Sequence, residues 1–332
     1  MKRILPLLVL TAPLAAQSFG DGPAFGGSRT FSEGLALKGN PARFDQAQPG
    51  WYLSWESGDD KPKGFQDASD RFRNTADAGA LKDLGQRPYA ERRSAYGLAV
   101  NAQGGLYFGL GRELLSAAHV VTDPASPGAG PVEMGRAVIN RLVMGAGSGT
   151  DGQAYGFALR VERLESGRAL APLDATTSAA GALAFEGTTR TNTALTLDLG
   201  AQFSVVPGLK VAFTGDRLLP RTFNGVREKA QFHAGVALDL GPTTALVVES
   251  DLNQAQRLPL PVDQRSAGAS LRFAFSPSLS LKVGAQRKTV DSQSTTLLGA
   301  SLTLRNAPLH LTFGFQFADD RPTKALALKV DG

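Results

Sequence analysis

Residues 309–317 read Leu309-His310-Leu311-Thr312-Phe313-Gly314-Phe315-Gln316-Phe317, so that every odd position is apolar and every even position is polar or small. Successive side chains of a strand point to opposite faces, and this segment therefore predicts a strand with one apolar and one polar face. In a soluble sandwich the apolar face would cover a core. In an exported chain with many such segments of about ten residues, it is better explained as the lipid-facing side of a barrel.

The same alternation runs almost without interruption from residue 195 to residue 317. The connections between the expected strands also alternate in length. Turns near residues 207, 241, 277 and 307 are tight and rich in Pro, Gly and Asn, whereas those near 219–229, 253–264, 288–294 and 318–323 are longer and polar. Short turns at one end and long loops at the other are typical of a membrane barrel.

The N-terminal half is less regular. It predicts strands at Trp51–Glu56, Tyr96–Ala102, Leu106–Leu114, about Arg136–Gly145, Tyr155–Leu164 and Ala182–Gly187, with an extended loop over Gly58–Arg93, a short helix near Ala76–Leu84 and a Pro/Gly-rich loop over Thr122–Pro131. The segment Glu113–Val121 fits a strand end or a helix. A last strand at Ala325–Val330 could pair with the first and close a ring. The fold class is therefore all-β, a single transmembrane antiparallel β-barrel of about 14 strands within a range of 12–16.

Residues 1–16 have the parts of a secretory signal: a positive start at Lys2-Arg3, an apolar run and small residues at Ala15-Ala16. The apolar run is too short to cross a bilayer as a helix. Without Lys2 and Arg3 the formal charge falls from +5 to +3, which gives no reason to expect nucleic acid as a partner. The chain has no cysteine, which agrees with a barrel whose ring of paired strands needs no disulfide.

Upstream of the first expected strand stands Asn40-Pro41-Ala42, after a Gly-rich approach and before Trp51–Trp55. This arrangement resembles the FadL-like family of long-chain fatty-acid transporters, with its PorV-like and TraF-like relatives. The resemblance implies a barrel over residues 50–332 and an N-terminal segment, residues 17–49, that lies in the lumen as a plug. Asn40, Pro41 and Ala42 are the residues that carry the family's plug motif.

Charged residues at expected inward positions are the other candidates for a lumenal role. They carry both signs, so they predict pairing across the lumen or contact with a plug or ligand rather than a single-sign selectivity ring. The members of this set are Lys210, Arg272, Lys282, Arg305, Asp198, Asp239 and Glu249.

Catalysis and metal binding are weakly indicated. The histidines His119, His233 and His310 are not spaced as zinc ligands, and no cysteine adds to them. His310 and Asp320 would lie roughly 30 Å apart along a strand, at opposite rims. The glycine-rich run of residues 145–152 lacks the Lys-Ser/Thr of a nucleotide loop and is better explained as a turn. We therefore expect no enzyme activity, no metal and no cofactor.

These features predict a barrel in the outer membrane of a Gram-negative envelope that passively takes up or binds a hydrophobic or amphipathic small molecule. Its expected partners are outer-membrane lipid, that ligand and the barrel-assembly machinery. The alternative is a non-conducting structural or assembly barrel of a secretion or conjugation system, and a soluble exported β-sandwich is a third possibility. An apolar pocket open towards the wall would favour transport, whereas a lumen crossed by salt bridges would favour a scaffold.

Overall fold

The computed structural model describes residues 40–43, 49–59, 89–102, 104–120, 132–150, 152–171, 189–290, 293–318 and 321–331. The expected signal peptide, most of the segment 17–49, the helix near Ala76–Leu84 and the strand at Ala182–Gly187 lie outside these residues. Among the described residues, no helix has the length and apolarity to span a membrane.

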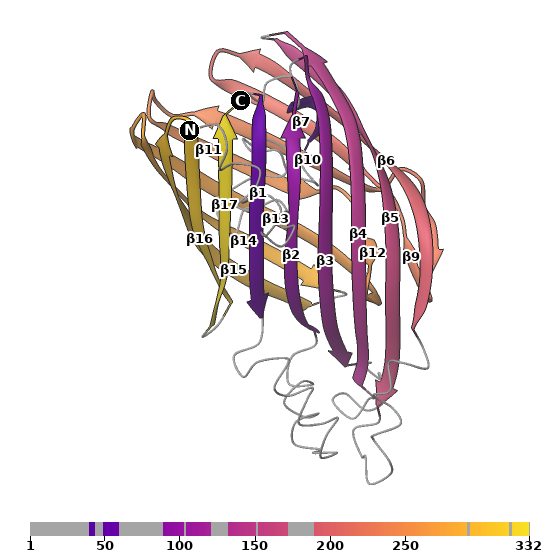
Figure 1. Cartoon of the computed structure of the whole chain (residues 1–332). Coiled ribbons are helices and arrows are strands. Elements are labelled where there is room, and N and C mark those ends of the chain that lie inside the picture. Colours follow the sequence, from indigo (N-terminus) through magenta and orange to yellow (C-terminus); the bar gives the residue numbers. More distant parts are fainter. Residues whose placement is uncertain are drawn as a thin grey trace, which may run out of the picture.

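Fourteen antiparallel strands form one closed ring (Figure 1), which confirms the predicted barrel and its strand number. β1 pairs with both β2 and β17, and β11 pairs with β13, so the ring has no open side. The barrel strands are β1 (Gly50–Asp59), β2 (Tyr89–Asn101), β3 (Leu106–Val120), β4 (Val132–Gly149), β5 (Gln153–Ala171), β6 (Arg190–Val206), β7 (Leu209–Asp216), β10 (Gln231–Asp239), β11 (Thr244–Asp251), β13 (Leu260–Ser276), β14 (Leu279–Val290), β15 (Gln293–Asn306), β16 (Leu309–Ala318) and β17 (Arg321–Asp331).

The alternation in the sequence sorts side chains between lipid and lumen as predicted. Phe313, Phe315 and Phe317 are 40%, 44% and 49% exposed, whereas Gly314 between them is buried. Turning the aromatic side chains outward places them where acyl chains, rather than water, can cover them. Most side chains on the inner face of the wall are polar or small, and a smaller set is apolar, including Leu115, Ile139 and Leu164.

Most strand predictions hold, and one undecided segment is now assigned. β3 continues to Val120, so Glu113–Val121 is strand apart from its last residue, which lies outside the described residues. The glycine-rich run of residues 145–152 ends β4 and turns into β5. Tight turns at residues 207–208, 277–278 and 307–308 join β6 to β7, β13 to β14 and β15 to β16.

The predictions of long loops near residues 288–294 and 318–323 are wrong. β14 runs to Val290 and β15 starts at Gln293, while β16 ends at Ala318 and β17 starts at Arg321, so each connection is only two residues long. The polar residues of these segments belong to strand ends. A strand that continues beyond the apolar belt into water can carry polar side chains on both faces, which removes the alternation that marks it within the membrane.

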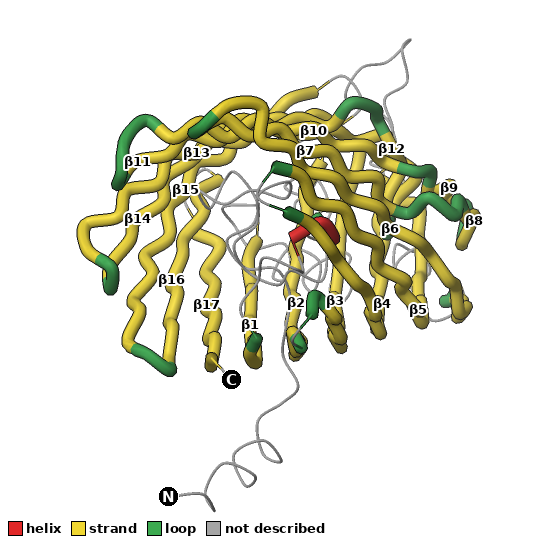
Figure 2. Tube along the Cα trace, turned by 90° about the horizontal axis from the view of Figure 1, so that it is seen from above, coloured by secondary structure: helices red, strands yellow, loops and turns green. Residues whose placement is uncertain are grey.

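The other two loops fold into the barrel. β8 (Arg221–Phe223) and β9 (Val226–Glu228) form a hairpin after β7, and β12 (Ala255–Arg257) pairs with β13 after β11. Asn224 and Gly225 at the hairpin tip have φ values of 48° and 79°, the left-handed pair that a two-residue turn requires. Hairpin and β12 contact each other. One helical turn, η2 (Pro41–Arg43), also lies inside the ring (Figure 2).

The wall is not equally high all round. Strands β2–β6 contain 13 to 19 residues, whereas β7, β10 and β11 contain eight or nine. The inward hairpin follows the first of these short strands. The hairpin therefore enters the barrel from the side on which the strands of the wall are shortest.

Candidate functional site

A network of buried ion pairs crosses the inner wall at mid-height on β3, β4 and β5. Arg141 Nη2 lies 2.5 Å from Glu113 Oε2, and Arg141 Nε lies 2.5 Å from Glu162 Oε1. All three side chains are at most 2% exposed. A buried charge is tolerated only when partners replace its lost hydration, so these three residues depend on one another.

The inward hairpin is tied into this network. Arg221 Nη2 lies 2.6 Å from Glu162 Oε2 on the wall and 2.5 Å from Glu228 Oε2 within the hairpin, and Arg217 Nε lies 3.7 Å from Glu228 Oε1. Burial alone would raise the pKa of Glu228, but the guanidiniums of Arg217 and Arg221 outweigh burial and hold that pKa below its ordinary value. Glu228 therefore stays ionised, and the hairpin stays attached.

The tip of the hairpin is fixed by hydrogen bonds to the end of β5. Arg168 Nη1 donates to the Asn224 carbonyl oxygen at 2.9 Å, and Asn224 Nδ2 donates to the Ser166 carbonyl oxygen at 3.0 Å. Arg168 also pairs with Glu133 of β4. These bonds attach the turn to the wall at the end of β5.

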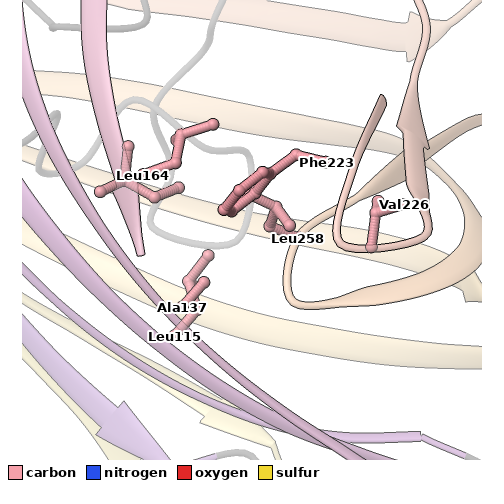
Figure 3. Packing of buried hydrophobic residues seen from close by; sticks show 7 residues of the cluster. Leu115, Ala137, Leu164, Phe223, Val226 and Leu258 are labelled. Atoms are coloured by element: carbon pink, nitrogen blue, oxygen red, sulfur yellow. The ribbon is translucent and has the colours of Figure 1, made fainter. Parts of the chain in front are cut away.

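Between the charged network and the long-loop end of the wall, the lumen contains an apolar layer, whose side chains are shown in Figure 3. Phe223 and Val226 of the hairpin and Leu258 after β12 pack against side chains of the wall. The wall side chains in this layer are Leu115, Ala137, Ile139 and Leu164. Since these residues sit at inward positions, the barrel carries apolar surface on its inside as well as on its lipid face.

The second inward segment, which is β12 with the residues that lead into β13, lies on a neighbouring part of the same wall. Leu260 and Pro259 lie directly over Gly135 of β4, where a Cβ atom would come within 2.9 Å of both. The Arg227 backbone nitrogen donates to Gln256 Oε1 at 3.1 Å, which joins the hairpin to β12. The two segments therefore form one inward unit that spans from β3–β5 to β13.

A second polar cluster joins β5, β6, β7, β10 and β11. Arg160 pairs with Asp198, and Asp198 Oδ1 accepts a hydrogen bond from the Arg217 backbone nitrogen at 2.8 Å. His233 lies between two carboxylates, with Nδ1 2.5 Å from Asp251 Oδ1 and Nε2 3.1 Å from Asp216 Oδ2. Within the part of the chain that the structure describes, no group of three or more His, Cys, Asp or Glu side chains could hold a metal ion.

The predicted plug motif lies against the inner wall near the short-turn end. Asn40, Pro41 and Ala42 are buried and contact β4, β5 and β6. Arg43 Nη1 donates to Gln202 Oε1 of β6 at 3.1 Å. This places the motif in the lumen, while the plug over residues 17–49 as a whole stays a prediction.

The predicted inward charges have different surroundings. Asp198 is buried with Arg160 as its partner, and Glu249 is 8% exposed, whereas Asp239 is exposed at the end of β10. The four basic residues of the set are half-buried: Lys210, Arg272, Lys282 and Arg305. Arg272 lies directly opposite Lys282, so two basic side chains are neighbours near the short-turn end, and Arg305 lies opposite His310.

The sequence did not single out the residues of the central network. Arg160 stands between Leu159 and Val161 in β5, and this alternation is the signal that could have identified it, whereas Glu113, Arg141 and Glu162 each have a polar neighbour in sequence. Choosing which acid meets which base requires the strand register, because Arg141 faces Glu162 directly and Glu113 only diagonally.

Comparison with known proteins gives a likeness of fold. No family model matches the sequence, and no curated protein matches it. A deltaS2S3 mutant of the monoaromatic hydrocarbon channel TodX has a TM-score of 0.58 at 10% identity, over 95% of this chain and 99% of that one; the toluene transporter TodX is a Pseudomonas putida protein. The monoaromatic hydrocarbon channel CymD has a TM-score of 0.52 at 12% identity, over 93% and 96%. A FadL homologue of Pseudomonas aeruginosa has a TM-score of 0.53 at 11% identity, over 96% and 99%. The predicted FadL-like resemblance is thus confirmed for the fold.

Proposed function

We propose that this chain is an outer-membrane barrel that binds a small hydrophobic or amphipathic molecule and lets it pass passively. The observation that carries the proposal is the apolar layer inside the lumen, where Phe223, Val226 and Leu258 pack on the wall. Outer-membrane lipid would surround the barrel, and barrel-assembly machinery would insert it.

The physical reason is a difference in transfer free energy. An uncharged apolar ligand that displaces Phe223 exchanges one apolar contact for another, whereas an ion or a sugar would lose hydration on entering the same layer. The layer therefore selects for hydrophobic solutes at the long-loop end. The named ligands of two solved barrels with this fold, monoaromatic hydrocarbons, belong to the same chemical class.

The test is binding and uptake of N-phenyl-1-naphthylamine, an aromatic dye that fluoresces in apolar surroundings. We expect saturable binding by the purified barrel, and faster dye entry into liposomes that contain it than into empty ones. Phe223→Asp should abolish saturable binding because it puts a carboxylate into the apolar layer. Thr222→Asp is the matched control, since Thr222 is the exposed neighbour in the same strand of the hairpin.

Heat-modifiable migration in mild detergent checks that both variants form the barrel. If the folded wild-type protein neither binds the dye saturably nor admits it faster than empty vesicles do, the uptake function is refuted.

The second candidate is a non-conducting structural or assembly barrel. It is favoured by the ion pairs that join wall and hairpin through Glu162, Arg221 and Glu228, because such ties oppose movement of the hairpin. Arg221→Gln removes the ion pair between hairpin and wall at Glu162. If the barrel is a scaffold, this variant, like the wild type, should neither bind the dye nor pass it. If it is an uptake barrel, the dye should enter liposomes faster through the variant than through the wild type.

A further inference from the structure

The outer face of β3, β4 and β5 changes from apolar to polar and basic between two neighbouring rows of residues. These strands lie side by side in the wall (Figure 1). The last apolar row consists of three exposed register partners, Leu110, Leu142 and Val161. The next outward row, two residues further towards the long-loop end, consists of Arg112, Asn140 and Arg163. The chain neighbours of these three residues form the buried network inside the lumen, so the row itself lies on the lipid side of the wall.

The height of this row places it at the edge of the hydrocarbon layer. From Gln153 at the short-turn end, β5 reaches Arg163 after ten residues, which is about 33 Å along the strand. A strand tilt of about 40° reduces this distance to about 25 Å along the membrane normal, which is the usual height of the apolar band. Because the long loops of an outer-membrane barrel lie outside the cell, the row is level with the headgroups of the outer leaflet.

The side chains of this row are mainly hydrogen-bond donors. Arg112 and Arg163 stand on either side of Asn140, about 10 Å apart across two strand spacings, and all three side chains are exposed. Tyr96 of β2 is the other register neighbour of Arg112 and is half-buried. A tyrosine at this depth is typical of a membrane interface, where its ring is covered and its hydroxyl stays wet.

The outward arginines differ from the inward ones in their partners. Inside the lumen, Arg141 pairs with two carboxylates. Among the residues that the structure describes, neither Arg112 nor Arg163 forms an ion pair. Arg136 adds a third exposed cation on the same face, four residues beyond Asn140 and about 13 Å further along β4.

Glu165 is the one carboxylate among the described outward residues of these three strands, and it lies two residues beyond Arg163. Three arginines against one glutamate leave an excess of positive charge beside the outer headgroup layer. Such an excess attracts an anion that comes from outside the protein.

We propose that Arg112, Asn140 and Arg163, with Arg136 beyond them, bind the phosphorylated sugar headgroup of an outer-leaflet glycolipid of the lipid A class. Guanidinium groups form paired, charge-assisted hydrogen bonds with phosphate oxygens. The Asn140 amide can both donate to and accept from sugar hydroxyls. The acyl chains of the same lipid lie against the apolar row below, so one molecule matches both the basic and the apolar part of this face.

The inference rests on the outer-membrane location in the proposed function, but it is independent of passage through the lumen. The test is binding of bis-phosphorylated lipid A to the full chain, refolded from urea into a neutral detergent so that no cellular lipid is carried over. Native mass spectrometry measures the fraction of barrel that holds lipid A as the lipid is titrated. Arg112→Gln and Arg163→Gln should each raise the dissociation constant about fivefold, which is the contribution of one basic residue near a charged headgroup layer.

Two further variants separate a site from general attraction to the basic rim. Glu165→Gln should lower the dissociation constant, because it removes the carboxylate beside the bound phosphates. Arg287→Gln is the matched control and should leave the dissociation constant unchanged. Arg287 is an exposed arginine of β14, and its register partners Ala267 and Thr296 carry no charge.

Dephosphorylated lipid A and phosphatidylglycerol are the comparison lipids. The first keeps the sugars and the second keeps a phosphate without them, so both should bind more weakly than lipid A. Three results would each overturn the site: no saturable lipid A binding by a barrel that shows heat-modifiable migration, equal losses in Arg287→Gln and Arg163→Gln, or equal affinity for phosphatidylglycerol. A barrel that fails in this way but still binds and admits the dye retains the uptake function, so the two failures are distinguishable.

Discussion

The two halves of the lumen wall fill their inner faces with different kinds of side chain. On β3–β6 the inner face carries large charged residues such as Arg141 and Glu162 that are completely buried and paired. On β13–β16 most of the buried polar residues are small, such as Ser270, Ser280 and Ser301, and the large basic residues Arg272, Lys282 and Arg305 are only half-buried. The inward turn and the hairpin both lie on the first half. The large charges of the second half therefore keep part of their surface exposed, whereas those of the first half depend on their protein partners alone.

The largest expected effect comes from breaking the ion pairs of the first half. Arg141→Met leaves Glu113 and Glu162 buried together without their shared cation. We expect a loss of about 3–5 kcal/mol in the free energy of unfolding, the usual result of removing one partner of a buried pair. Urea titration in detergent, followed by tryptophan fluorescence, measures it.

The matched control is Arg136→Met on the same strand, because the Arg136 side chain is exposed. It should change the free energy of unfolding by no more than about 0.5 kcal/mol. Equal losses in both variants would show that the loss in Arg141→Met does not come from its buried ion pairs.

An intermediate effect is expected from acid on the hairpin that covers the first half. The pKa of Glu228 is lowered in the folded protein, so its ion pairs with Arg217 and Arg221 are complete above the ordinary pKa of a glutamate. They are lost only as the pH falls through the lowered value. A spin label at Thr222→Cys should therefore keep its low mobility as the pH falls through the ordinary pKa of a glutamate, about 4.3, and gain mobility only at lower pH.

Glu228→Gln is the control for this titration, because it removes the charge at every pH. Its label should be mobile throughout and show no acid transition. A wild-type transition centred at the ordinary glutamate pKa would contradict the described pairing.

The smallest effect is expected from the second half. Thr303 Oγ1 and Thr312 Oγ1 lie 2.9 Å apart on β15 and β16. Both residues are half-buried, so Thr303→Val should lower the free energy of unfolding by about 0.5–1 kcal/mol, the net worth of one neutral hydrogen bond. The same urea titration measures it, and a loss as large as that of Arg141→Met would remove the contrast between the halves.

The wall was predictable from the sequence, because lipid on one side and polar or small side chains on the other impose a period of two. That period identified the strands from Thr193 onward, the tight turns and the strand that closes the ring. It failed at 288–294 and 318–323, where strands continue into water and the period is no longer imposed.

The content of the lumen was less predictable. Asn224-Gly225 is a hairpin signal that could have been read from the sequence, and it correctly marks the tip between β8 and β9. Nothing local shows that this hairpin turns inward, since Phe223 and Val226 meet Leu164 and Leu258 only after the ring has formed. The same holds for the ion pairs, which require the register of strands far apart in the chain.

The pairing of β1 with β17 has a consequence for biogenesis. The first strand finds its second neighbour about 270 residues further along the chain, so the cylinder cannot be completed until β17 has been delivered. A protein that lacks β17 would leave β1 and β16 with unsatisfied backbone groups facing hydrocarbon, at several kcal/mol each. Quality control of the nascent protein can thus depend on the arrival of this one strand.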